Sequence, residues 1–81
     1  MSYEYELQSE GPRHVARYAH RGHPVDVVTG WDVRSDKWLL HIYIDGEKLD
    51  GVGGVADTMD EAFQYGIRAA IDHINRNDMH G

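Results

Sequence analysis

The 81-residue chain contains no cysteine. Disulfide bonds and thiolate metal sites are therefore excluded as sources of stability or chemistry. A chain of this length without such crosslinks depends on one hydrophobic core, which predicts a single domain. The absence of cysteine is also typical of a reducing compartment, so we expect a cytoplasmic protein.

Long apolar runs are also missing. Apolar stretches such as Trp38-Leu39-Leu40 are far too short to span a bilayer. The first four residues, Met1 to Glu4, are acidic and lack the apolar segment of a signal peptide. We therefore expect no membrane association.

Basic residues are scarce, with eight Lys and Arg against fourteen Asp and Glu and a formal net charge of −6. This balance favours solubility and weighs against unspecific binding to nucleic acids. The charges are unevenly distributed: residues 11–25 hold three arginines, three histidines and no acid, whereas residues 45–61 hold six acids and one lysine. A basic segment is therefore expected to face an acidic one, within one chain or between chains.

Alternation of apolar and polar residues predicts β-strands over 14–20, 25–34, 37–44 and 47–55. Residues 3–8 alternate in the same way, so we assign residues 1–12 to an N-terminal strand or a flexible segment. Asp45-Gly46 has the composition of a tight hairpin turn. One face of the strands is strongly apolar; it comprises Val25, Val27, Thr29, Trp31, Val33, Trp38, Leu40, Ile42 and Ile44.

A helix is predicted from Thr58, because Thr58-Met59-Asp60-Glu61 matches a capping box. Its apolar stripe comprises Met59, Phe63, Ile67, Ala70, Ile71 and Ile74, and its solvent side Asp60, Gln64, Arg68, Asp72 and Asn75. The expected fold is α+β: an antiparallel β-meander of three to four strands with one C-terminal amphipathic helix on one face. The domain spans residues 13–75, and residues 76–81 form a polar tail.

Gly51-Val52-Gly53-Gly54 precedes the helix in the manner of a phosphate-binding loop. Asp57, Asp60 and Glu61 at the helix start would repel an anion, so a bulged or flexible edge strand is the better interpretation. No nucleophile motif is present, and no carboxylate has the apolar surroundings of a general acid. We therefore expect no enzymatic activity, no cofactor and no small-molecule substrate.

Three histidines lie close together in the sequence, at His14, His20 and His23. Neutral imidazoles bind Zn²⁺ or Ni²⁺, but a closed site needs four ligands, and the neighbouring arginines oppose a cation. Solvent-exposed histidines are the favoured interpretation, and no metal site is predicted.

Arg13, Arg17 and Arg21 are candidate contacts for nucleic-acid phosphates, with Tyr18 as an aromatic that could stack on a base. The contrary interpretation is a solvated strand whose arginines pair with nearby acids. A nucleic-acid-associated regulator that uses residues 13–23 is therefore the alternative function.

The second face of the sheet is the leading candidate site. One helix covers one face, which leaves Val28, Leu39, His41 and Tyr43 on the other, with Gly30 among them. Exposed apolar patches of this kind mark contact surfaces, although single apolar residues scattered on a solvated sheet are also common. The sequence thus favours a non-enzymatic protein-interaction or regulatory module that binds a protein partner or forms a homodimer.

From Tyr18 onward the chain resembles a group of small bacterial proteins without an assigned activity. The shared features are Tyr18 to Gly22, Lys37-Trp38, Asp45-Gly46 and Thr58-Met59-Asp60-Glu61-Ala62. The resemblance implies a β-meander followed by a helix, and no particular activity. Residues 57–74 are also similar to the helix of HicB-type antitoxin domains, which shares the Thr-x-x-Glu-Ala start; the Gly-Tyr and Pro-Gly-Cys signals of that family's strands are absent.

Overall fold

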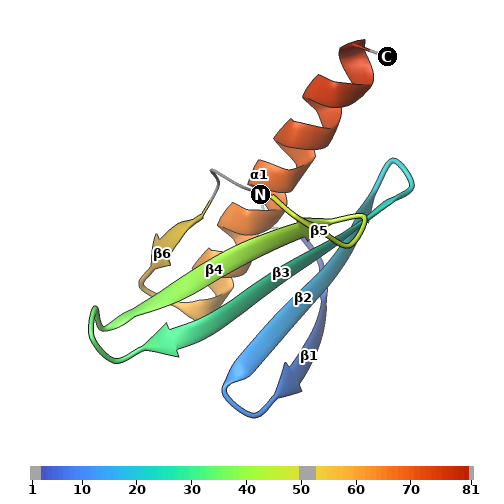
Figure 1. Ribbon diagram of the computed structural model, residues 1–81. Helices are drawn as coiled ribbons and strands as arrows, with labels where there is room; N and C mark the ends of the chain where they lie inside the picture. Colours follow the sequence, from blue (N-terminus) through green and yellow to red (C-terminus); the bar gives the residue numbers. More distant parts are fainter. Residues whose placement is uncertain (1–2, 50–52, 81) are drawn as a thin grey trace.

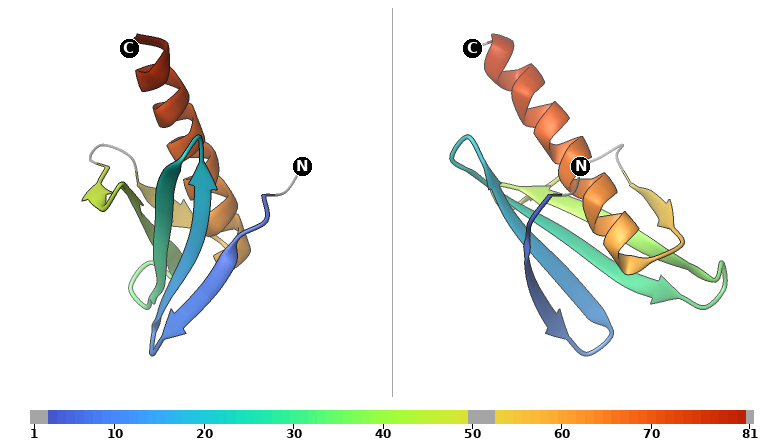
Figure 2. Two further views of the ribbon diagram at one scale, coloured as in Figure 1. Left: turned by 90° about the vertical axis from the view of Figure 1, so that its right-hand side faces the viewer. Right: turned by 180° about the vertical axis from the view of Figure 1, so that it is seen from behind.

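The structure is a computed structural model that describes residues 3–49 and 53–80. It has two layers, an antiparallel sheet and one helix packed on one of its faces (Figures 1 and 2). The elements are β1 (Glu6–Glu10), β2 (Arg13–His20), β3 (His23–Asp32), β4 (Lys37–Ile44), β5 (Glu47–Lys48), β6 (Gly54–Ala56) and α1 (Met59–His80). The expected α+β class and the packed C-terminal helix are confirmed.

The strands follow the order β1-β2-β3-β4-β5, and β6 also pairs with β4. Three of the hairpins have two-residue turns, and in two of these, Arg21-Gly22 and Asp45-Gly46, both residues have positive φ angles. Such turns match the right-handed twist of the strands they join, and glycine adopts the positive φ without strain. The hairpin predicted at Asp45-Gly46 is therefore confirmed.

The sheet has more strands than the sequence pattern predicted. Residues 6–10 form a full edge strand, and the single strand expected over 47–55 is two short strands, both antiparallel to β4. Residues 50–52 lie outside the described part of the chain. Val33, expected on the apolar face, is 84% exposed because β3 ends at Asp32 and the chain turns there.

The core lies between α1 and the central strands β3 and β4. Phe63 and Ile67 are fully buried, as predicted, and share one cluster with Leu40; Trp38 packs at its margin, whereas Trp31 is 45% exposed. The helix begins as expected, since the N–H of Glu61 donates to Thr58 Oγ1 at 3.1 Å. It continues to His80, however, so the polar tail expected from residue 76 is helical as far as residue 80.

The segment before β1 closes against the helix. The N–H of Tyr3 donates to Gln64 Oε1 at 2.7 Å, and Gln64 Nε2 donates to the Tyr3 carbonyl at 2.9 Å. The Tyr5 hydroxyl donates to Asp60 at 2.8 Å, and its ring meets Phe63 edge-on at 4.9 Å. We call these contacts the N-terminal clasp. Gln64 and Asp60, expected to face solvent, are thus partners of the N-terminal segment.

Candidate functional site

The register of the strands defines the sheet face that α1 does not cover. Paired residues of an antiparallel sheet project to the same side, and alternate residues project to opposite sides. Val28 of β3 pairs with Val15 and His41, whereas its neighbour Val27 lies in the core under the helix. The open face, as we name it, therefore comprises Glu6, Gln8, Glu10, Arg13, Val15, Arg17, Ala19, Pro24, Asp26, Val28, Gly30, Asp32, Lys37, Leu39, His41, Tyr43, Lys48 and Val55.

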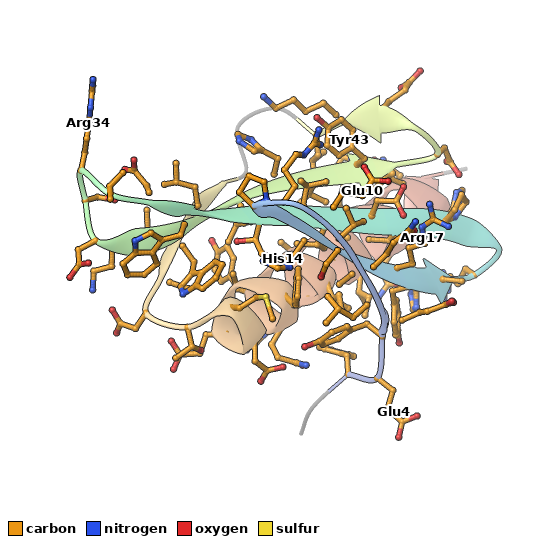
Figure 3. All side chains as sticks on the ribbon, turned by 90° about the horizontal axis from the view of Figure 1, so that it is seen from below. Glu4, Glu10, His14, Arg17, Arg34 and Tyr43 are labelled. Atoms are coloured by element: carbon orange, nitrogen blue, oxygen red, sulfur yellow. The ribbon has the colours of Figure 1, made fainter. Side chains whose placement is uncertain are left out.

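Figure 3 shows the two sides of the sheet. Tyr43 and Glu10 project away from the helix, and His14 projects toward it. On the helix side, the ring centroids of His14 and Trp38 lie 5.9 Å apart, and His14 Nδ1 lies 2.7 Å from Ser9 Oγ. Helix packing and the open face are thus separate surfaces built from the same strands.

A hollow of about 280 Å³ lies at the middle of the open face. Its lining includes all four residues that the sequence singled out, Val28, Leu39, His41 and Tyr43, together with Gly30. Gly30 has no side chain to fill the space between its neighbours on β2 and β4, Arg13 and Leu39. The hollow is therefore a consequence of one glycine in a central strand.

The four residues differ in exposure. Val28 retains only 9% of its accessible surface, although no helix covers it, whereas Leu39 is 38% exposed. Val28 sits centrally in the sheet and is flanked across the strands by Val15 and His41. The structure thus brings the predicted interface residues together around a half-buried apolar centre.

Charged residues surround this apolar centre in alternating order. One row across the sheet reads Glu6, Arg17, Asp26, Tyr43, Lys48, each paired with the next. Arg17 Nε lies 4.0 Å from Asp26 Oδ1. A second row begins with Glu10 beside Arg13 and continues to Gly30, Leu39 and Val55.

Sequence reasoning missed three features of the open face: Val15, the acidic strand β1 and the deep burial of Val28. Val15 lies directly across from Val28 and lines a second hollow with Gln8 and Arg17. The alternation of residues along β2 places Val15 on the opposite face from Ala16, which is fully buried under the helix. That Val15 lies across from Val28, however, depends on the strand register, which the pattern of a single strand does not give.

The three candidate phosphate contacts are not one cluster. Arg13 and Arg17 lie on the open face, each with an acid of β1 as its cross-strand neighbour, Glu10 and Glu6. Arg21 lies in the turn between β2 and β3. The arrangement intersperses the arginines with carboxylates rather than forming a continuous basic surface.

The histidines are held by separate partners. His20 Nε2 lies 2.8 Å from Asn75 Oδ1 of the helix, and His23 Nδ1 lies 2.9 Å from Asp45 Oδ2. Among the residues that the structure describes, no three His, Asp or Glu side chains form a group that could hold a metal ion. Gly51 and Val52 of the glycine-rich segment lie outside those residues, and Gly54 opens β6.

No protein-family model matches this sequence, and comparisons with curated proteins and with solved structures find no significant match. In the described part of the chain, no helix combines the length and the apolar character needed to cross a membrane.

Proposed function

We propose that this chain is a non-enzymatic protein-interaction module whose contact surface is the open face. The observation that carries the proposal is the hollow around Gly30, which Val28, Leu39, His41 and Tyr43 line together. An apolar and aromatic centre inside a rim of charge is the usual anatomy of a protein interface.

The position of the hollow supports a preformed binding surface. Its residues lie on β3 and β4, the two strands that carry the core. Both strands are hydrogen-bonded on each side, β3 to β2 and β4, and β4 to β3, β5 and β6. A partner would therefore meet side chains held by a rigid scaffold, which lowers the entropic cost of association.

The polar groups beside the hollow favour recognition over catalysis. The Ser35 hydroxyl donates to Asp32 at 2.8 Å and holds the pKa of that carboxyl below its ordinary value. Asp32 is therefore an ionised acceptor at neutral pH, whereas a general acid needs a raised pKa. Asp26 is likewise matched by Arg17 at 4.0 Å. A charge pair such as Arg17–Asp26 supplies specificity at an interface.

The proposal is tested by radical footprinting under two conditions. The side-chain reactivity of the pure, dilute chain is compared with its reactivity in a concentrated extract of its own cells. Leu39 and Tyr43 should become less reactive in the extract, because a bound partner excludes solvent from the open face. Exposed Tyr65 on the helix serves as an internal reference. Leu39→Asp should abolish the protection of Tyr43, while Val33→Asp, which places the same charge in the β3–β4 turn, should leave it unchanged. Equal labelling under all conditions, including high concentration of the pure chain, would remove the proposal.

A nucleic-acid-associated regulator remains the second candidate, because Arg13 and Arg17 share the open face. Phosphate binding by two or three arginines would give an affinity that falls steeply with salt. Each arginine, however, stands beside a carboxylate that competes with phosphate. Absence of binding to RNA and DNA at low salt would eliminate this candidate.

A further inference from the structure

We infer that the open face binds a second copy of this chain, face to face, about a two-fold axis parallel to the strands and close to β3. The inference rests on the proposed function and names its partner. In this arrangement β1 of one protomer lies over β5 and β6 of the other, and the hollows around Gly30 face each other near the axis.

The charge of the open face is the first support. The whole chain carries a formal charge of −6, which opposes association of two copies. The open face carries little of this excess: by register it holds four acidic residues (Glu6, Glu10, Asp26 and Asp32) and the basic residues Arg13, Arg17 and Lys48, while Lys37 of the same face is paired with Asp57. Most of the acidic excess therefore lies elsewhere, and two copies that meet on this face experience little net repulsion.

The order of the charges gives the orientation. A two-fold axis parallel to the strands reverses the order of the strands in the second copy. Each row of cross-strand pairs then lies over the same row of the partner, read in the opposite direction. The row Glu6, Arg17, Asp26, Tyr43, Lys48 then places Glu6 over the partner's Lys48 and Arg17 over the partner's Tyr43. The first contact joins opposite charges, and the second sets a guanidinium against an aromatic ring.

The remaining rows place apolar groups at the centre. Val28 lies over the same valine of the second copy, and Leu39 covers the aliphatic part of its Arg13. Asp26 and Asp32 both lie on β3, so each meets its own equivalent near the axis, and these are the two like-charge contacts of the arrangement. Arg17 of the same copy lies 4.0 Å from Asp26 and offsets that charge, and Lys37 is the cross-strand neighbour of Asp32.

The other two-fold arrangements oppose like charges. An axis across the strands would lay the row of Glu6 and Arg17 over the row of Glu10 and Arg13, acid on acid and base on base. Antiparallel pairing of two β1 edges centred on Gln8 would place Glu6 directly opposite the partner's Glu10. Of these three arrangements, the one with the axis along the strands brings charges of opposite sign together, Glu6 and the partner's Lys48.

The size of the face sets the expected affinity. Five strands at about 4.8 Å spacing, with a length of about 26 Å for an eight-residue strand, offer roughly 600 Å² per copy. The total of about 1,200 Å² is at the lower end of specific interfaces. We therefore expect a reversible dimer that dissociates on dilution rather than an obligate one.

Crosslinking tests the orientation, because the chain has no native cysteine to interfere. β1 lies two strands from β3, so equivalent β1 positions are about 20 Å apart across the axis. A mixture of Glu6→Cys and Lys48→Cys chains, treated with a short bis-maleimide, should give the mixed dimer and little of either homodimer. A mixture with Val33→Cys in place of Lys48→Cys controls for random collision. Predominant crosslinking of Glu6→Cys to itself would overturn the orientation.

Sedimentation equilibrium tests the charge pairing. Lys48→Glu should weaken the dimer about tenfold, because each dimer contains two Glu6–Lys48 contacts. Adding Glu6→Lys to that variant should restore the affinity, whereas a purely structural effect of either substitution would persist in the double variant.

The outcomes separate the two proposals. If the wild type stays monomeric at millimolar concentration while Leu39 and Tyr43 are still protected in cell extract, the homodimer is overturned and the partner is a different protein. If the chain is monomeric and its open face is unprotected both as the pure protein and in cell extract, the proposed function is overturned as well.

Discussion

Gly66 of α1 lies directly over Val27 of β3, so close that a Cβ atom on Gly66 would stand 2.6 Å from Val27 Cγ1 and 2.9 Å from Cγ2. Glycine in the middle of a helix costs about 1 kcal/mol relative to alanine. Here it permits the helix backbone to approach the centre of the sheet, where Val27 is fully buried. The close approach of the two layers at this point therefore depends on a residue without a side chain.

We expect Gly66→Ala to destabilise the domain by about 1–2 kcal/mol. Overpacking against a stiff, buried valine outweighs the gain in helix propensity. In a Val27→Ala background most of the clash is absent, so the same substitution should be neutral or stabilising. A double-mutant cycle by urea denaturation measures the coupling; additive effects would mean that the helix sits further from the sheet.

Gly30→Val should separate stability from association. The backbone at Gly30 does not require a positive φ, and an added Cβ would meet only the Pro12 carbonyl oxygen, at an ordinary 3.6 Å. A β-branched residue in the strand should stabilise the monomer by about 0.5–1 kcal/mol. The new side chain fills the hollow, so dimerisation should be lost in sedimentation experiments. Gly30→Ala is the matched control, with a similar backbone effect and a smaller loss of the hollow.

Gln64→Leu should release the N-terminal segment. It removes the two hydrogen bonds to Tyr3, each worth about 1 kcal/mol. Hydrogen exchange followed by mass spectrometry should show faster exchange over residues 3–10 and unchanged protection in β3 and β4. Arg68→Leu, an exposed substitution one turn further along the helix, should leave both regions unchanged. Equal exchange of residues 3–10 in both variants would show that the clasp does not hold β1.

Tyr5 should make the domain less stable in strong alkali. Burial of the ring, the hydrogen bond to Asp60 and the charge of that carboxylate raise the pKa of Tyr5 to about 12, from 10.0. The folded state therefore keeps its proton where the unfolded chain loses it, so the contribution to stability is complete below pH 10 and is lost as the pH rises toward 12. The decline in unfolding free energy over this range should be shallower in Tyr5→Phe than in wild type. Parallel declines would show that Tyr5 titrates normally.

The sequence predicted the features that depend on neighbouring residues. The Thr58 cap, the stripe containing Phe63 and Ile67, and the Asp45-Gly46 turn all have local causes, and each is present. Alternation also assigned Leu39 and Tyr43 to the face opposite the helix, since the two faces of a strand differ by one residue.

The rest depends on residues that are distant in the sequence. Gln64 and Asp60 lie on the polar side of the helix, and only the N-terminal segment, more than 50 residues away, gives them partners. The register between β1 and β2 places Glu6 and Glu10 beside the arginines, and no periodicity within one strand contains that information. Gly66 interrupts an otherwise ordinary helix pattern. The reason for a glycine there is its close approach to Val27, a contact that the helix sequence alone does not indicate.

The N-terminal clasp joins residues that are far apart in the sequence, since Gln64 lies 61 positions after Tyr3. During translation the N-terminal segment leaves the ribosome first and waits for its partners until α1 has been synthesised and released. In that interval β1 lacks the helix contacts that fix the residues before it. Its acidic side chains, Glu6 and Glu10, then discourage two nascent chains from pairing edge to edge. Carboxylates at these two positions therefore disfavour edge pairing in the unfinished chain as well as in the finished one.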